Sequence, residues 1–361
     1  MSLPTLSRAR PAVRIGPFSA VLRLSVLLTV AGLVAATLVL FALDISVGEF
    51  GIPLGRVLDV LAGGGTRAQR FVIFESRLPR AVTAVVAGAA LGLAGAITQS
   101  ILHNPLASPD LLGITAGASF AAVAAVAGTG TATGVAATVG VPLAALAGGL
   151  LTAAAIYVLA WGRSRDGAAG ATGMRLVLIG IGVNALLLSG VSWLMTRATL
   201  TDATRAQLWL TGSLNGADWS RAVPAAIALT VVLVVTAASA RTLAALRFGT
   251  ETTRALGVRL QAQQGLLLGA AVVAASLATA AVGPVAFVGL AAPQIARRLL
   301  RLPGEPVLGS ALVGALVVVG ADVVARTVVP VDLPVGIITA ALGGPFLLLL
   351  LVRTNRKATI S

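Results

Sequence analysis

Apolar runs long enough to cross a bilayer recur along the whole chain, and this feature restricts the fold more than any other. The 361-residue chain is 57% hydrophobic and 11% charged, and its mean hydropathy of +0.99 lies far outside the range of soluble globular domains. Membrane-spanning β-strands would instead show short segments of alternating hydrophobicity. The sequence therefore predicts an all-α integral membrane protein.

We predict about ten transmembrane helices in one domain, residues 20–352, between cytoplasmic tails of residues 1–19 and 353–361. The predicted spans are 20–43, 78–102, 110–128, 135–161, 173–195, 222–241, 260–282, 285–300, 307–327 and 334–352. The first run is too long for a cleaved signal peptide, so we interpret it as an uncleaved span. Most Lys and Arg residues then face the cytoplasm, which favours placing both termini there. They form no continuous basic stripe, so the net charge of +14 does not predict a nucleic-acid partner.

Two short motifs recur at one spacing. "LAGA" at Leu93–Ala96 matches "LATA" at Leu277–Ala280, and "LASPDL" at Leu106–Leu111 matches "LAAPQI" at Leu290–Ile295, both 184 residues further on. Five predicted spans separate the copies. Because this number is odd, the sequence predicts an inverted internal repeat, an arrangement typical of transporters.

The second predicted span has a small-residue string and a sharp end. "GAALGLAGA", Gly88 to Ala96, is interpreted as a packing face, because small residues let helix backbones approach closely in lipid. Pro105 and Pro109 then predict a break near His103, with Asp110 starting the next span. We interpret the lone histidine as a capping or solvated residue rather than a metal ligand.

The chain offers no catalytic constellation. It contains no cysteine and one histidine, and its acidic residues lie almost entirely in loops or at span ends. Ion-coupled carriers usually depend on carboxylates inside the membrane, so their near absence argues against that class. The single lysine, Lys357, follows no glycine-rich loop, so the chain has no P-loop. If nucleotide drives this protein, a separate subunit binds it.

The longest polar segment on the predicted cytoplasmic side is Arg247 to Gln264. Thr250 is a plausible N-cap, Glu251 suits the positive end of a helix dipole, and Gly257 suits a C-terminal stop after Arg254. The segment is therefore expected to form a short helix. It could dock into a partner or be an ordinary solvated loop, and the pattern alone leaves both open.

Arginines on the opposite side run against the charge bias. Arg77 and Arg80 lie at the start of the second span, where we expect an extended or irregular approach from which they can project together toward the outer water. Asp322 and Arg326 are four residues apart and share a helix face. Such guanidinium groups suit an acidic partner, but they could equally reach lipid headgroups.

Several long motifs occur in one order along almost the whole chain after the first span. They are "RLPRAVTAVVAGAALGLAGAITQSILHNPLASPDLLGITAGAS", "LRFGTETTRALGV", "VGPVAFVGLAAPQIAR", "GADVVAR" and "DLPVGIITAALGGPF". Together they closely resemble the FecCD-type permeases of ABC importers, which carry iron-siderophores, cobalamin or haem.

This resemblance implies a multi-pass, type II ABC importer permease of the bacterial cytoplasmic (inner) membrane, in contact with membrane lipid. It implies a second permease subunit, identical or related, and an extracytoplasmic solute-binding protein. It also implies two ATPase subunits, which would bind the ATP and Mg, so that this chain needs no cofactor, has no metal site and is not itself an enzyme.

The resemblance also implies roles for individual residues. Arg77, Arg80 and Arg326 match arginines that dock the binding protein. The ATPase-coupling residues would be Thr250, Glu251, Arg254, Ala255, Leu256 and Gly257. One departure is Gln294, which stands where family members often have a histidine, so no titrating role is assigned there. The sequence does not identify substrate-binding residues.

The outer segment "QLWLTGSLNGADWSR", Gln207 to Arg221, is more similar to siderophore permeases than to cobalamin ones. We therefore expect a ferric siderophore as the transported substrate, with cobalamin or haem as the alternative. Two other functions are less favoured by the sequence: an ion-coupled secondary carrier and, third, a structural membrane scaffold.

Overall fold

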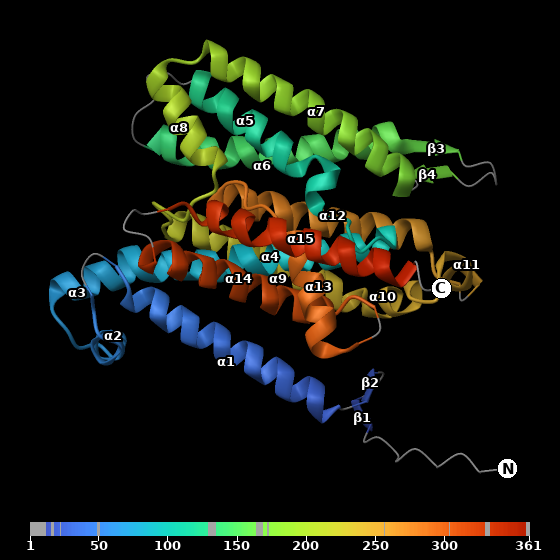
Figure 1. The fold of residues 1–361 in the computed structure, drawn as a ribbon, viewed down its shortest axis with the longest axis horizontal. Coiled ribbons are helices and arrows are strands. Elements are labelled where there is room, and N and C mark those ends of the chain that lie inside the picture. Colours follow the sequence, from blue (N-terminus) through green and yellow to red (C-terminus); the bar gives the residue numbers. More distant parts are fainter. Residues whose placement is uncertain are drawn as a thin grey trace.

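The computed structural model describes residues 12–15, 18–21, 23–48, 51–128, 135–163, 169–171, 173–255, 257–302, 304–328 and 333–358 (Figure 1). Its elements in chain order are β1 (Ala12–Ile15), β2 (Phe18–Val21), α1 (Leu24–Ser46), α2 (Leu54–Leu61), α3 (Arg67–Phe71), a π-helix η1 (Val72–Arg77), α4 (Leu78–Leu102), a 3-10 helix η2 (Pro109–Leu112), α5 (Ile114–Gly128), α6 (Val135–Ala160), β3 (Trp161–Arg163), β4 (Ala169–Ala171), α7 (Gly173–Arg197), α8 (Leu200–Leu210), α9 (Trp219–Ala238), α10 (Ala240–Leu246), α11 (Thr250–Ala255), α12 (Leu260–Val282), α13 (Val288–Leu300), α14 (Val307–Thr327) and α15 (Val335–Ala358).

Each predicted span corresponds to one helix, namely α1, α4, α5, α6, α7, α9, α12, α13, α14 and α15. Within the described residues, seven helical segments are long and apolar enough to cross a membrane, and shorter apolar stretches lie within α5 (Ile114–Ala127) and α15 (Val335–Leu349). The remaining one, α13, has 13 residues and carries two arginines in its last turn. The all-α membrane fold expected from the apolar runs is confirmed.

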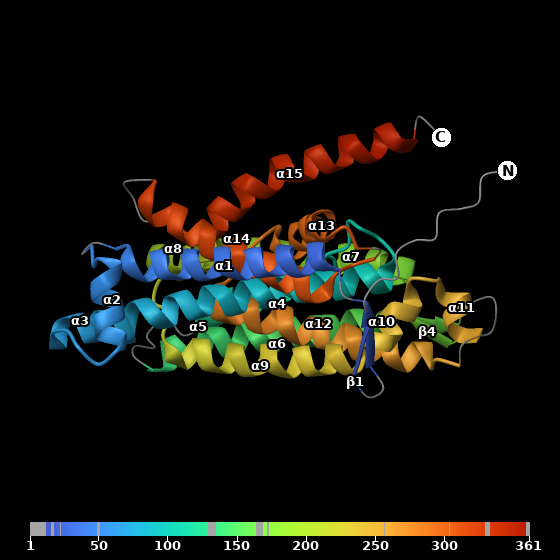
Figure 2. The ribbon, with the colours of Figure 1, turned by 90° about the horizontal axis from the view of Figure 1, so that it is seen from below.

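The long helices run lengthwise, and α4 lies among α9, α12, α13 and α14 (Figures 1 and 2). The small residues of α4 make this central position achievable. A β-carbon on Gly95 would overlap the carbonyl oxygen of Gly289 in α13, and one on Gly88 would overlap that of Gly314 in α14. The predicted packing face is thus confirmed, since only glycine lets these backbones meet.

Two ends of the bundle matter for function. We call them the α3 end and the α11 end, at the left and right of Figure 2. At the α3 end, α4 begins near Asn215, which accepts a hydrogen bond from Arg80, and α12 finishes at Val282, whose carbonyl oxygen accepts one from the Ser213 amide. The two helices that carry the first pair of repeated motifs therefore run antiparallel, as an inverted repeat requires.

The second pair of motifs adopts two different conformations. Leu106–Leu111 comprises a turn and the first three residues of η2, whereas Leu290–Ile295 is helical within α13. The break after α4 is confirmed: His103 is left-handed, with φ 48°, and the Asn104 side chain accepts a hydrogen bond from the Leu106 amide. The prediction that Asp110 starts the next span is wrong, because α5 begins only at Ile114, after η2.

Several elements were not predicted from the sequence. They are the short helices α2, α3, α8 and α10, the π-helix η1, the 3-10 helix η2 and the two hairpins, β1–β2 and β3–β4. The helix α8 begins at a clear cap, where the Thr199 hydroxyl accepts a hydrogen bond from the Asp202 amide. It is too short and too polar to register as an apolar run.

Candidate functional sites

Arg80 is held between two helices and a loop at the α3 end. Its guanidinium donates hydrogen bonds of 2.8 Å to both carboxylate oxygens of Asp322 in α14 and one of 2.7 Å to the side-chain oxygen of Asn215. The Asp322 side chain is 0% exposed, whereas that of Arg80 is 18% exposed. This two-pronged geometry is the strongest arrangement open to an arginine and a carboxylate.

Arg326 links the same aspartate to the first helix. Its Nη1 atom lies 3.9 Å from Asp322, the helix-face pairing that the four-residue spacing predicted, and 3.7 Å from the carboxylate of Asp44 in α1. Its Nη2 atom donates hydrogen bonds to the carbonyl oxygens of Asp44 and Val47. Arg326 therefore closes the last turn of α1, where backbone carbonyls lack helical partners.

Arg77 also binds the last turn of α1. It donates hydrogen bonds of 2.8 Å and 3.1 Å to the carbonyl oxygens of Ile45 and Ser46, and the residue is 7% exposed. The expectation that Arg77 projects into outer water is wrong. The chain does not approach α4 as an extended segment but as α3 and η1, and this helical path directs Arg77 toward α1.

These side chains form one unit, which we call the arginine cluster: Arg77, Arg80, Arg326, Asp44 and Asp322. With both carboxylates ionised, its three guanidinium groups leave one net positive charge. Sequence reasoning missed Asp44, although a single carboxylate closing an apolar run is a usable signal. It also missed Asn215, which holds Arg80 from the outer segment.

The helices α10 and α11 project at the opposite end (Figures 1 and 2). Gly249 and Gly257, with φ values of 91° and 78°, bracket α11, as the predicted C-terminal stop at Gly257 required. Arg254, Ala255 and Gly257 are exposed. The helix α11 already includes Thr250, the predicted N-cap, and Gly249 directly precedes it. Leu256 lies outside the described residues, as do the side chains of Thr250 and Glu251.

Thr253 fastens α11 to α10. The residue is fully buried, and its hydroxyl lies 2.9 Å from the Ala245 carbonyl oxygen and 2.7 Å from that of Gly249. In turn, Nε2 of His103, at the end of α4, lies 3.1 Å from the carbonyl oxygen of Leu246 in α10. These contacts connect α11 through α10 to the central helix.

A polar network continues from α4 to α13 at the same end. The amide nitrogen of Gln294, 1% exposed, donates hydrogen bonds to the side-chain oxygen of Gln99 at 2.6 Å and to the carbonyl oxygen of Pro105 at 3.1 Å. Its own side-chain oxygen accepts one from Arg297 at 2.8 Å. The neutral amide of Gln294 forms hydrogen bonds with all three groups, so its side chain joins α4 to α13.

Arg297 extends the network to Glu305, in the segment between α13 and α14, through an ion pair of 3.1 Å. Burial raises the pKa of the Glu305 carboxyl, and the positive charges of Arg297 and Arg247 partly oppose that rise. The three side chains line a cavity of about 200 Å³ beside His103. The α10–α11 unit therefore contacts the membrane helices through charged as well as backbone groups.

The profile of the FecCD transport family matches residues 36–353. The chain is 38% identical over 333 residues to the ferric enterobactin transport system permease protein FepG of Escherichia coli (strain K12), covering 92% of this chain and 97% of FepG. It is 35% identical over 322 residues to the iron(3+)-hydroxamate import system permease protein FhuG of Bacillus subtilis (strain 168), covering 88% and 94%. The fold is similar to that of a metal-chelate type ABC transporter solved in an inward-facing conformation, with a TM-score of 0.76 and 24% identity over 91% of this chain and 99% of that one. With the motifs and the fold in agreement, the chain belongs to the FecCD transport family.

Proposed function

We propose that this chain is the permease subunit of an ATP-driven ABC importer and moves a ferric siderophore across the bacterial cytoplasmic membrane by alternating access. FepG and FhuG are permease proteins of iron-chelate systems, and the chain aligns with almost their full length. The observation that carries the proposal is the arrangement of the two candidate sites, at opposite ends of one membrane bundle. In this proposal the α11 end is cytoplasmic, as are both termini.

The α10–α11 unit is the proposed coupling element. Its helix α11 is polar and carries the exposed Arg254, Thr253 fastens α11 to α10, and His103 connects α10 to α4. A separate ATPase subunit would bind ATP and Mg and would press against α11 when it closes. Helices α4 and α13, joined by the network around Gln294, would then move largely as rigid bodies.

The arginine cluster is the proposed docking site for an extracytoplasmic binding protein. Its net positive charge favours an acidic partner, and Arg80 is its most exposed guanidinium. Arg77 and Arg326 contribute charge and hold α1 in place beneath the contact. A second permease subunit, identical or related, completes the proposed importer.

The test is uptake of radiolabelled iron-siderophore by proteoliposomes that contain the permease with its ATPase and binding protein. Replacing both Arg254 and Ala255 with Glu should abolish uptake while ATP hydrolysis continues, because the altered helix no longer seats in the ATPase. Arg197→Glu, an exposed arginine at the other end of the bundle, is the control and should transport normally. Normal uptake by the double variant would contradict the coupling role, and uptake of cobalamin or haem in place of the siderophore would contradict the proposed substrate.

A further inference from the structure

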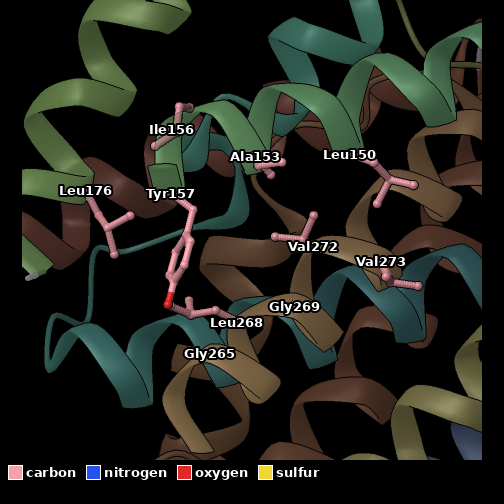
Figure 3. A pocket seen from close by; sticks show the side chains of 11 residues that line it. Leu150, Ala153, Ile156, Tyr157, Leu176, Gly265, Leu268, Gly269, Val272 and Val273 are labelled. Atoms are coloured by element: carbon pink, nitrogen blue, oxygen red, sulfur yellow. The ribbon is translucent and has the colours of Figure 1, made fainter. Parts of the chain in front are cut away.

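A cavity of about 420 Å³ lies between α6, the start of α7 and α12 (Figure 3). This volume falls within the range of about 300 to 1,000 Å³ that is typical of ligand sites. Tyr157 alone among the eleven lining residues has a polar side-chain atom. The lining consists of Leu150, Ala153, Ala154, Ile156, Tyr157, Leu176, Gly265, Leu268, Gly269, Val272 and Val273.

The cavity opens onto an exposed apolar surface of the bundle. Ala154 of α6 and Gly269 of α12, at its two edges, are both exposed. The large apolar residues beside them, Leu151, Val158 and Leu266, are more than half exposed, as expected of side chains that face hydrocarbon. An apolar cavity of this kind does not hold ordered water well, so a hydrocarbon chain is the occupant that its surface favours.

Two glycines keep the cavity open without serving helix packing. A β-carbon on Gly269 would meet no atom within 4 Å, and one on Gly265 would meet only the Tyr157 hydroxyl, at 3.5 Å. Gly95 differs, because the neighbouring backbone leaves no room for a side chain there. Gly265 and Gly269 are four residues apart and therefore clear one continuous strip along α12.

Polar and aromatic groups gather where the cavity approaches the α11 end. The Tyr157 ring packs edge-on against Trp161, with ring centres 5.5 Å apart. The guanidinium of Arg175, which is exposed and precedes the lining residue Leu176, lies directly over Gly162. Aromatic rings with an adjacent arginine are typical of the level of lipid headgroups.

We propose that this cavity binds one acyl chain of an anionic phospholipid, and that Arg175 binds the lipid phosphate. The apolar strip matches a hydrocarbon chain, and the positive charge at its polar end matches an anionic headgroup. The site lies in the leaflet at the α11 end. Only the description of that leaflet as cytoplasmic rests on the proposed function.

The test is native mass spectrometry of the purified full chain, titrated separately with phosphatidylglycerol and phosphatidylcholine of identical acyl chains. The first bound phosphatidylglycerol should bind about five-fold more tightly, and Arg175→Gln should remove this preference, as expected for one basic group at a headgroup. Gly269→Leu should fill the cavity and weaken the first binding event for both lipids. Gly32→Leu, at an exposed and uncrowded glycine of α1, and Arg197→Gln, at the other end of α7, are the matched controls.

Equal binding of the two lipids by the unmodified chain would overturn the headgroup assignment. Unchanged binding by Gly269→Leu would overturn the acyl-chain site. If Gly269→Leu does not fold, Gly265→Leu fills the same strip and decides the question. Loss of lipid binding without loss of transport would leave the proposed function intact, so the two claims fail separately.

Discussion

Arg80 and Asp322, which are 242 residues apart in the sequence, form a two-pronged ion pair with both hydrogen bonds at 2.8 Å. The pair joins the start of the central helix to the end of α14, and the buried aspartate has no solvent to replace its partner. Removing one member of such a pair leaves an uncompensated charge. The arginine cluster is therefore part of the fold as well as a candidate docking surface.

Arg80→Ala should lower the free energy of unfolding by about 3 kcal/mol, because Asp322 loses its two-pronged partner and the other arginine beside it, Arg326, lies farther away at 3.9 Å. Thermal unfolding in detergent measures this loss. Arg56→Ala is the matched control, since the Arg56–Asp59 pair is exposed and such pairs contribute about 1 kcal/mol or less. Equal shifts for the two variants would contradict the structural role of Arg80.

Thr253→Val should loosen α11. Loss of the buried hydroxyl removes its contacts with the Ala245 and Gly249 carbonyl oxygens, at a cost of about 1 kcal/mol. Amide hydrogen exchange in α11 should then become about five-fold faster while exchange in α4 is unchanged. Thr252→Val, at the exposed neighbouring position, provides the comparison. If both variants exchange alike, Thr253 does not hold the coupling element.

Gly95→Ala should destabilise the bundle by about 1 to 3 kcal/mol, because the new methyl group overlaps the Gly289 carbonyl and forces α4 away from α13. Gly182→Ala, within α7, meets no atom within 4 Å and should be neutral or slightly stabilising. Melting temperatures of the two variants check this difference. A stable Gly95→Ala protein would show that α4 and α13 do not approach as closely as described.

Glu305 should make stability depend on pH. Burial raises its folded-state pKa above the ordinary value of 4.5, so the folded protein retains this proton at pH values where the unfolded chain has lost it. Its contribution is therefore complete below the ordinary value and declines as the pH rises through the folded-state pKa. Relative to Glu305→Gln, which does not titrate, the melting temperature of the unmodified chain should fall over this interval. A difference that stays constant or grows with pH would contradict the raised pKa.

The sequence predicted the helices well because long apolar runs and prolines act locally. Each of the ten predicted apolar spans corresponds to a helix in the structure, and the predicted break after α4 lies at His103. Side-chain direction was harder to predict, since it depends on partners distant in the chain. Arg77 was expected in water, but α3 and η1 turn it toward Ile45, and no local pattern shows that contact.

The candidate sites divide in the same way. Gly257 ends α11 as its local pattern required. The pairing of Asp322 with Arg326 followed from helix spacing, whereas the pairing of Arg80 with Asp322 required the packing of α4 on α14. The residue types in the sequence therefore indicated where the two candidate sites lie, but the tertiary structure was needed to show which side chains contact one another.

The most direct test of the proposed transport mechanism compares two preparations of proteoliposomes in which the same permease chain is reconstituted in the bilayer. One contains the ATPase, binding protein and ATP, and the other contains only the permease under an imposed proton or sodium gradient. The proposed mechanism predicts concentrative ferric-siderophore uptake in the first and none in the second. Uphill uptake by the permease alone, driven by the ion gradient, would contradict it.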